Sequence, residues 1–316
     1  MEHKLNGYIP SQPDSRDYKL EMYGISNEDR PKKFILNDLP PVENQGSTGQ
    51  CVAYSLSNII ARNQFLETGQ MINYSKGFIY AQKIFDYQEG MIPRVALSRL
   101  TKYGTVEASR FELQGDYKEV KEAYDKWRSG FESFESMLQF SKPNRFESFA
   151  RLESIDEIKD ALLDNRMVSI AVSVRSNFDR PNSANFISYD ESQDIRGGHM
   201  ISIVGYDDER QAFLIQNSWG KSYGDNGFAW LSYDYPLLEA WGIFDWKPEK
   251  YETIIKLQIG NEKMTVNGKE KELRVAPFLK QYSDEFSATC TEIRPVFEEI
   301  GDVEWDKETN TVIIKV

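Results

Sequence analysis

The stretch Gln45-Gly46-Ser47-Thr48-Gly49-Gln50-Cys51 decides how the rest of this sequence is interpreted. It is a glycine-punctuated loop, and apolar residues recur after it at helical spacing until Gly69, a natural C-terminal stop. The pattern predicts a helix that begins at Cys51. Because unpaired backbone N–H groups at a helix start favour negative charge, we expect the pKa of the Cys51 thiol to be lowered towards the nucleophilic thiolate.

A cysteine nucleophile needs a proton acceptor, and the sequence contains only two histidines, His3 and His199. His3 lies in a terminus that we expect to fray, so His199 is the candidate partner of Cys51. A lone cysteine is more commonly a small buried apolar side chain, and only the loop before Cys51 changes that interpretation.

Two apolar runs, residues 200–206 and 213–216, flank a polar turn and predict a β-hairpin centred between Asp208 and Glu209. In that register His199 faces Ser218, with Asn217 adjacent. The hairpin therefore brings an imidazole and an amide together at its open end.

The amide of Gln45 lies six positions before Cys51 in the loop. It can point to the same place as the backbone N–H of Cys51, and two converging donors make an oxyanion hole. The alternative is that Gln45 is only a turn residue.

Three sequence blocks resemble the papain-like cysteine peptidases, in particular their bacterial relatives. Residues 45–55 are similar to the active-site helix, residues 197–206 to the histidine strand, and Asn217-Ser218-Trp219-Gly220 to the asparagine block. The separation of Cys51 and His199, 199 − 51 = 148 residues, lies within the roughly 130–150 typical of the family.

This resemblance implies an α+β fold with a helical lobe and a β-barrel-like lobe, and hydrolysis of peptide bonds through a thioester on Cys51. It implies that His199 is general base and acid, that Asn217 orients its ring, and that Gln45 and the Cys51 N–H bind the oxyanion. Trp219 would shield the imidazole–amide bond, and Gly90, Gly198 and Trp219 are the substrate-binding candidates. No cofactor and no metal are implied.

The sequence also departs from the better-known members of the family. Thr48 replaces half of a disulfide, Val52 replaces an aromatic residue, and Glu89 replaces a glycine beside Gly90. The long inhibitory propeptide is absent, so activity must be restrained by location, by substrate access or by the N-terminal lead-in. A hydrophobic residue two positions before the cleaved bond is the usual preference of the family.

We expect three parts: an extended lead-in (residues 1–37), a papain-like catalytic domain (38–250) and a small α+β module (251–316). The module resembles the N-terminal domain of copper amine oxidases, but residues 252–316 contain no histidine, which argues against a copper site. It is a candidate for binding a protein or cell-surface partner, and Cys290 within it is expected to be an idle thiol. Further elements are expected as helices at 76–86, 93–103, 117–127, 155–163 and 293–300, strands at 167–174, 253–259 and 311–316, and an Asn267-Gly268 hairpin.

Composition limits the possible partners and locations. The net charge of −12 disfavours nucleic acid and anionic membranes, and no segment has the length and apolarity of a membrane span. Two cysteines and the lack of a signal peptide favour the cytoplasm. The tail resembles surface modules, so a cell-surface or extracellular location applies if the sequence has been trimmed.

Three other functions remain open from sequence alone. The chain could be a cysteine amidase or isopeptidase acting on cell-wall or cross-linked peptides. It could be an inactive homologue that binds peptides, or an adhesion protein whose tail is the functional part.

Overall fold

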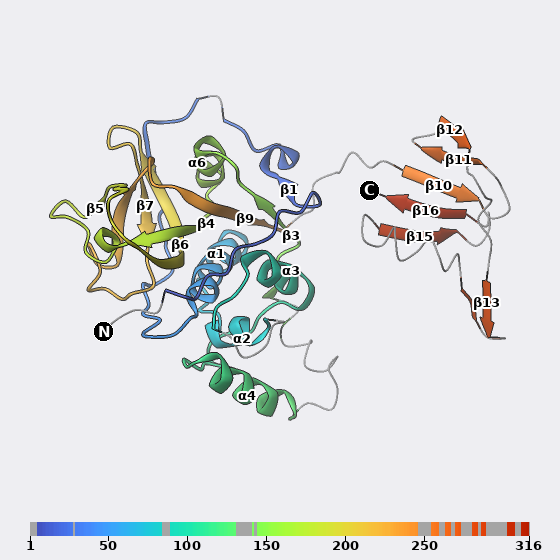
Figure 1. The fold of residues 1–316 in the computed structure, drawn as a ribbon, viewed down its shortest axis with the longest axis horizontal. Helices are drawn as coiled ribbons and strands as arrows, with labels where there is room; N and C mark the ends of the chain where they lie inside the picture. Colours follow the sequence, from blue (N-terminus) through green and yellow to red (C-terminus); the bar gives the residue numbers. More distant parts are fainter. Residues whose placement is uncertain are drawn as a thin grey trace. The chain divides into compact units, whose positions relative to one another are not determined.

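The computed structural model describes residues 5–27, 29–83, 89–130, 141 and 144–245, and the tail segments 254–258, 263–266, 269–272, 280–283, 286–288, 302–306 and 311–315. The chain forms two compact units, Met1–Pro248 and Glu249–Val316 (Figure 1). Each unit has its own sheet.

Helices make one lobe of the first unit: α1 (Cys51–Thr68), α2 (Lys76–Ala81), α3 (Pro93–Tyr103) and α4 (Tyr117–Arg128). α1 begins at Cys51, as predicted, and stops at Gly69, which takes the left-handed conformation that glycine favours. α2 ends earlier than predicted, at Ala81, and residues 84–88 lie outside the described part of the chain. α1 is the central helix, because it contacts α2 and α3 on one side and the sheet on the other.

The second lobe is a nine-stranded sheet in the order β1-β3-β9-β4-β6-β7-β8-β5, with β2 paired to β6. Its strands are β1 (Tyr18–Lys19), β2 (Lys33–Ile35), β3 (Ser148–Arg151), β4 (Val168–Arg175), β5 (Phe186–Ile187), β6 (Ile195–Asp207), β7 (Ala212–Gln216), β8 (Phe228–Ser232) and β9 (Leu237–Phe244). Two further helices accompany it, α6 (Ile155–Leu163) and the 3-10 turn η3 (Ser176–Phe178). The two lobes are the α+β arrangement that the resemblance implied.

The predicted register of the β6–β7 hairpin is wrong by one to two residues. Tyr206 pairs with Phe213, and Ile203 pairs with Ile215 after an irregularity between Ile203 and Gly205. The cause is the turn: Gln211 takes a left-handed conformation, and Asp207 Oδ1 accepts the N–H groups of Glu209 and Arg210 at 3.0 and 3.1 Å. Residue 211 therefore belongs to the turn and not to the strand.

The lead-in contains more regular structure than an extended segment. It provides β1, the 3-10 helix η1 (Leu20–Tyr23) and β2. The short strand β2 pairs antiparallel with the end of β6. Leu20 and Tyr23 are buried, and the Tyr23 ring stacks on Phe244 at 3.8 Å between centroids. Figure 1 shows the start of the lead-in, in dark blue, crossing α1 on its way to β1.

The second unit contains a five-stranded sheet in the order β12-β11-β10-β16-β15. Its strands are β10 (Ile254–Gln258), β11 (Lys263–Val266), β12 (Lys269–Glu272), β15 (Asp302–Asp306) and β16 (Thr311–Lys315), and β13 (Lys280–Ser283) pairs separately with β14 (Phe286–Ala288). Val266 pairs with Lys269, which confirms the predicted hairpin. The predicted helix 293–300 and Cys290 lie outside the described residues. No helix in the described part of the chain is both long and apolar enough to cross a membrane.

Candidate active site

Cys51 is the first residue of α1 and is fully buried between the two lobes. Its sulfur receives backbone N–H groups from Cys51 and Val52, at the helix start, and from Met200 on β6. Met200 directly follows His199, so the thiol lies against the strand that carries the candidate base. The sequence showed only the order of these two blocks along the chain. The structure shows that Cys51 and the strand that carries His199 are in contact.

The state of the thiol differs from the sequence expectation. Burial raises the pKa of Cys51 to about 12, although the N–H groups of Met200, Val52 and Cys51 act in the opposite direction. Loss of hydration destabilises the thiolate by more than the N–H groups at the helix start stabilise it. The neutral thiol is therefore favoured in this closed state. The N–H groups at the helix start do lower the thiol pKa, as expected, but burial raises it by more.

His199 is oriented by Asn217, which follows β7. The ring Nε2 and Asn217 Oδ1 are 2.8 Å apart, and the Ser218 N–H donates to the same Oδ1 at 2.8 Å. An oxygen that already accepts a backbone N–H is an acceptor, so Nε2 carries the proton and donates it to Asn217. Nδ1 is then the ring nitrogen that can exchange a proton with a thiol.

Aromatic rings enclose this imidazole–amide pair. The Trp219 ring stacks on His199 with centroids 4.8 Å apart and planes 27° apart, and Trp219 is only 2% exposed. The ring of Phe178, from η3, meets His199 edge-on at 6.3 Å. Excluding water in this way strengthens the hydrogen bond that orients the ring. Phe178 was not found from sequence, because nothing in its local pattern points to His199.

Gln45 is fully buried and its amide is held at both ends. Ser218 Oγ donates to Oε1 at 2.6 Å, and Nε2 donates to the Thr48 carbonyl at 2.8 Å. The backbone N–H of Gln45 also bonds to the Ser218 carbonyl at 2.8 Å. Ser218 therefore joins the Gln45 loop to the Asn217 loop. In the sequence, Ser218 belongs to the Asn217-Ser218-Trp219-Gly220 block, but nothing in that pattern points to a contact with Gln45.

The predicted substrate-binding glycines lie in the same region. The Gly90 N–H donates to the Tyr80 hydroxyl at 3.0 Å, and the Gly90 carbonyl accepts Lys83 Nζ at 3.1 Å. Both backbone groups of Gly90 are thus used within the protein, and the N–H and carbonyl of the neighbouring Met91 bond to the lead-in. Gly198 precedes His199 on β6 and is packed against the ring of Tyr8.

A stretch of the lead-in, residues 5–11, runs between the two lobes beside Cys51 and is called the cleft segment below. Its backbone pairs with Met91 in parallel, since Met91 N–H donates to the Gly7 carbonyl and Ile9 N–H to the Met91 carbonyl, each at 3.0 Å. A methyl group added at Gly7 would lie 2.7 Å from the Cys51 sulfur. The cleft segment therefore covers the thiol, and a substrate cannot occupy the same space.

The reactive and polar side chains at this site are few in kind. They provide one sulfur, one imidazole and several hydrogen-bond donors. Within the described residues, no group of three or more His, Cys, Asp or Glu side chains could hold a metal ion.

Two relatives of known sequence match about 70% of this chain. The chain is 24% identical over 274 residues to the Uncharacterized peptidase C1-like protein L477 of Acanthamoeba polyphaga mimivirus, covering 72% of this chain and 81% of that protein. It is 23% identical over 244 residues to bovine cathepsin S, covering 70% of this chain and 64% of cathepsin S. The chain thus spans less than two thirds of the length of cathepsin S.

Solved structures share the fold. Xylellain, a cysteine protease from Xylella fastidiosa, superposes with a TM-score of 0.62 at 24% identity and covers 78% of this chain and 99% of its own. Digestive procathepsin L 3 from Tenebrio molitor gives a TM-score of 0.51 at 17% identity, covering 70% of this chain and 72% of its own.

Family models match both units. Residues 247–314 match the Copper amine oxidase N-terminal domain, and residues 30–236 match the Papain family cysteine protease. The second match covers well over half of the chain, and the resemblance found in the sequence is confirmed. The chain belongs to the papain family of cysteine proteases and is a cysteine-type peptidase, a hydrolase.

Proposed function

We propose that this peptidase is an endopeptidase that cleaves peptide bonds through a thioester on Cys51, with His199 as general base and acid. The observation that supports this most directly is the His199–Asn217 hydrogen bond of 2.8 Å on the strand that contacts the thiol. Because Nε2 donates its proton to the Asn217 carboxamide, Nδ1 is the ring nitrogen left for proton transfer. This is the arrangement that a cysteine nucleophile requires.

The reaction has two halves. His199 Nδ1 first takes the proton of the Cys51 thiol, and the resulting thiolate attacks the carbonyl carbon, so that a C–S bond forms as the π electron pair moves to oxygen. Collapse of this intermediate breaks the C–N bond, and His199 gives its Nδ1 proton to the departing nitrogen. Water then attacks the thioester while His199 accepts its proton, the C–S bond breaks, and the carboxylic acid leaves.

Gln45 and the backbone N–H of Cys51 stabilise the negative oxygen of each tetrahedral intermediate. The Gln45 amide has two N–H donors, and Thr48 uses one of them. Because Ser218 fixes the oxygen end of that amide, the second N–H is held in place before substrate arrives. Preorganised donors of this kind are worth roughly 2.7–4 kcal/mol each in a transition state.

The test is Cys51→Ala in the full chain, assayed on a peptide library and on purified cell-wall material. We expect the wild type to cut internal bonds of library peptides and Cys51→Ala to cut none, although the variant stays folded at pH 7. Cleavage by Cys51→Ala would remove Cys51 from its role. Activity on wall material alone would replace endopeptidase with amidase.

A further inference from the structure

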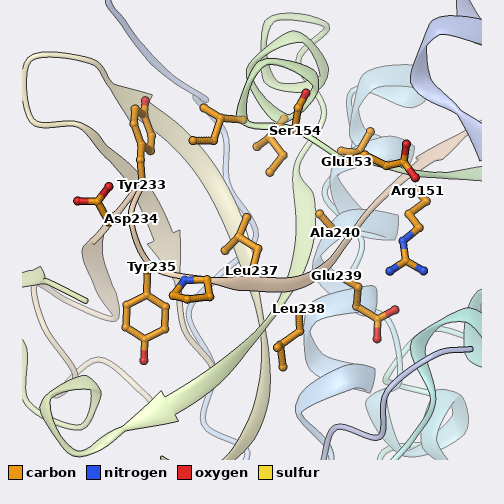
Figure 2. Close-up of a pocket in the computed structure, with 14 residues that line it drawn as sticks. Arg151, Glu153, Ser154, Tyr233, Asp234, Tyr235, Leu237, Leu238, Glu239 and Ala240 are labelled. Atoms are coloured by element: carbon orange, nitrogen blue, oxygen red, sulfur yellow. The ribbon is translucent and has the colours of Figure 1, made fainter. Parts of the chain in front are cut away.

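A hollow between the β8–β9 turn and the start of α6 adjoins the active site. It has a volume of about 410 Å³, and Figure 2 shows Tyr233 at one end of it and Arg151 at the other. Glu239 lines this hollow and also bonds to the Tyr8 hydroxyl of the cleft segment. This hollow is therefore not separate from the site described above.

A larger hollow, of about 620 Å³, lies on the outer face of β7 and β8 and contains none of the active-site residues. Side chains alternate along these strands: Ile215 and Leu231 are buried in the core, whereas the lining residues Leu214, Phe228 and Trp230 are half-buried. Leu214 pairs directly with Trp230 across the two strands. The outward face of an antiparallel sheet is commonly polar, so an apolar floor in a hollow of this size indicates a binding site.

The indole of Trp230 is held in place by two cations. Arg210 and Lys33 lie over the ring, with Cζ at 5.0 Å and Nζ at 5.7 Å from its centroid. Both pair with Oδ2 of Asp207, at 3.6 and 3.2 Å, so they lie on the same side of the ring. The ring is thus positioned before a ligand arrives, and the side away from Asp207 carries neither cation.

The charges of this hollow are balanced. Among the described residues that line it, Arg210 is the one cation and Asp225 is the one anion. An anionic ligand such as a phosphate is bound best where cations are in excess, and a cationic ligand where carboxylates are in excess. The lining therefore favours a ligand without net charge.

Two asparagines add amide groups beside the apolar floor. Asn185 and Asn226 both line the hollow, and both take the left-handed conformation, with φ of 54° and 53°. Asparagine adopts this conformation more readily than most residues. Asn226 Nδ2 donates to Asp225 Oδ1 at 2.9 Å, whereas the Asn185 amide has no hydrogen-bond partner in the described part of the chain. Donors and acceptors are thus available to a ligand.

A neutral sugar fits these features better than a peptide does. The C–H groups of a sugar ring pack on an aromatic face, and its hydroxyls both donate and accept hydrogen bonds, as an asparagine amide does. A peptide that pairs with a sheet needs a free strand edge, but β7 lies between β6 and β8, and β8 lies between β7 and β5.

We propose that this hollow binds a neutral oligosaccharide, with Trp230 against a sugar ring and with Asn185 and Asn226 bonded to its hydroxyls. Because the hollow contains no active-site residue, a bound glycan anchors the enzyme on glycan-bearing material without blocking Cys51. The inference does not rest on the proposed endopeptidase function.

The experiment measures binding of the full chain to an array of neutral and acidic oligosaccharides. We expect neutral oligosaccharides to bind, and Trp230→Ala to weaken that binding about tenfold or more, because it removes the aromatic floor. Asn185→Gly removes an amide but keeps the left-handed backbone, and it should weaken binding about three- to tenfold, the effect of losing one hydrogen bond. Trp127→Ala, which removes a half-buried indole from α4 in the helical lobe, is the matched control and should leave binding unchanged.

Isothermal titration with the tightest array ligand gives the Kd values, and thermal unfolding shows whether each variant is folded. If Trp230→Ala does not fold, the Kd of Asn185→Gly decides the test. Absence of binding on the array, binding of acidic oligosaccharides alone, or binding that neither variant changes would overturn the proposed site. Equal weakening in Trp127→Ala would overturn it too, as would Trp230-dependent binding of peptides in place of oligosaccharides.

Discussion

Two parts of the molecule meet the Cys51 sulfur and are held in place very differently. On one side His199, Asn217 and Trp219 are buried side chains that belong to the sheet lobe and its core. On the other side the cleft segment is held by two backbone hydrogen bonds to Met91, a backbone bridge between Asn6 and Gly198, and the buried ring of Tyr8 with its contact to Glu239. The reacting groups are thus positioned by the sheet lobe, whereas access to them requires the cleft segment to be displaced.

The largest effect should come from the fixed side. We expect His199→Ala to lower kcat about 10³- to 10⁴-fold, the typical contribution of general acid–base catalysis. Asn217→Ala should lower it only about 10- to 100-fold, since it removes one buried hydrogen bond of roughly 1–3 kcal/mol from a residue that orients the base. Single-turnover kinetics measures both. Equal losses would mean that Asn217 does more than orient the ring.

Alkylation of Cys51 by iodoacetamide measures how the cleft segment affects the thiol. Burial raises the pKa of Cys51 to about 12. The rate of alkylation in the full chain should therefore keep rising about tenfold per pH unit beyond pH 9, because only the thiolate reacts. A plateau at pH 8 to 9 would indicate an exposed thiol and contradict the closed state.

The same raised pKa predicts the sign of a stability change. An unfolded cysteine loses its proton near its ordinary value of about 8.5, while the buried Cys51 keeps it. The unfolded state is therefore favoured as pH rises above that value, and the wild type should lose stability relative to Cys51→Ala. Thermal unfolding of the two proteins at pH 7 and pH 10 tests this; a constant difference would contradict it.

The smallest effect should come from the anchor at α3. Arg94 binds Asp14 at 2.8 Å and Asp17 at 2.7 Å, on the lead-in just after the cleft segment. These pairs are partly exposed, so Arg94→Ala should loosen the segment by only about 0.2–1 kcal/mol and raise alkylation of Cys51 about two- to fivefold. Lys19→Ala removes an exposed pair with Glu153 and serves as control. An identical rise in that control would indicate general destabilisation.

Local sequence signals identified the fixed side well. Gly69 marked the end of α1, and Cys51 its start, because both positions depend on backbone conformation within a few residues. The Asn-Gly pair likewise identified the β11–β12 hairpin. The β6–β7 register was missed because it depends on how Asp207 and Gln211 shape the turn, which apolar spacing does not reveal.

By itself, the sequence determined the family, the two-lobed fold and the candidates Cys51, His199, Asn217 and Gln45, because these lie in short blocks whose spacing is constrained. Only the tertiary structure decided that Met91, and not Gly90, pairs across the cleft, that residues 5–11 cover the thiol, and that Glu239 faces Tyr8. Each of these contacts joins residues more than 80 positions apart or depends on burial, and burial is a property of the packed molecule. For the same reason the helix start alone predicted a lowered thiol pKa, whereas exclusion of water by the assembled lobes and the lead-in raised it.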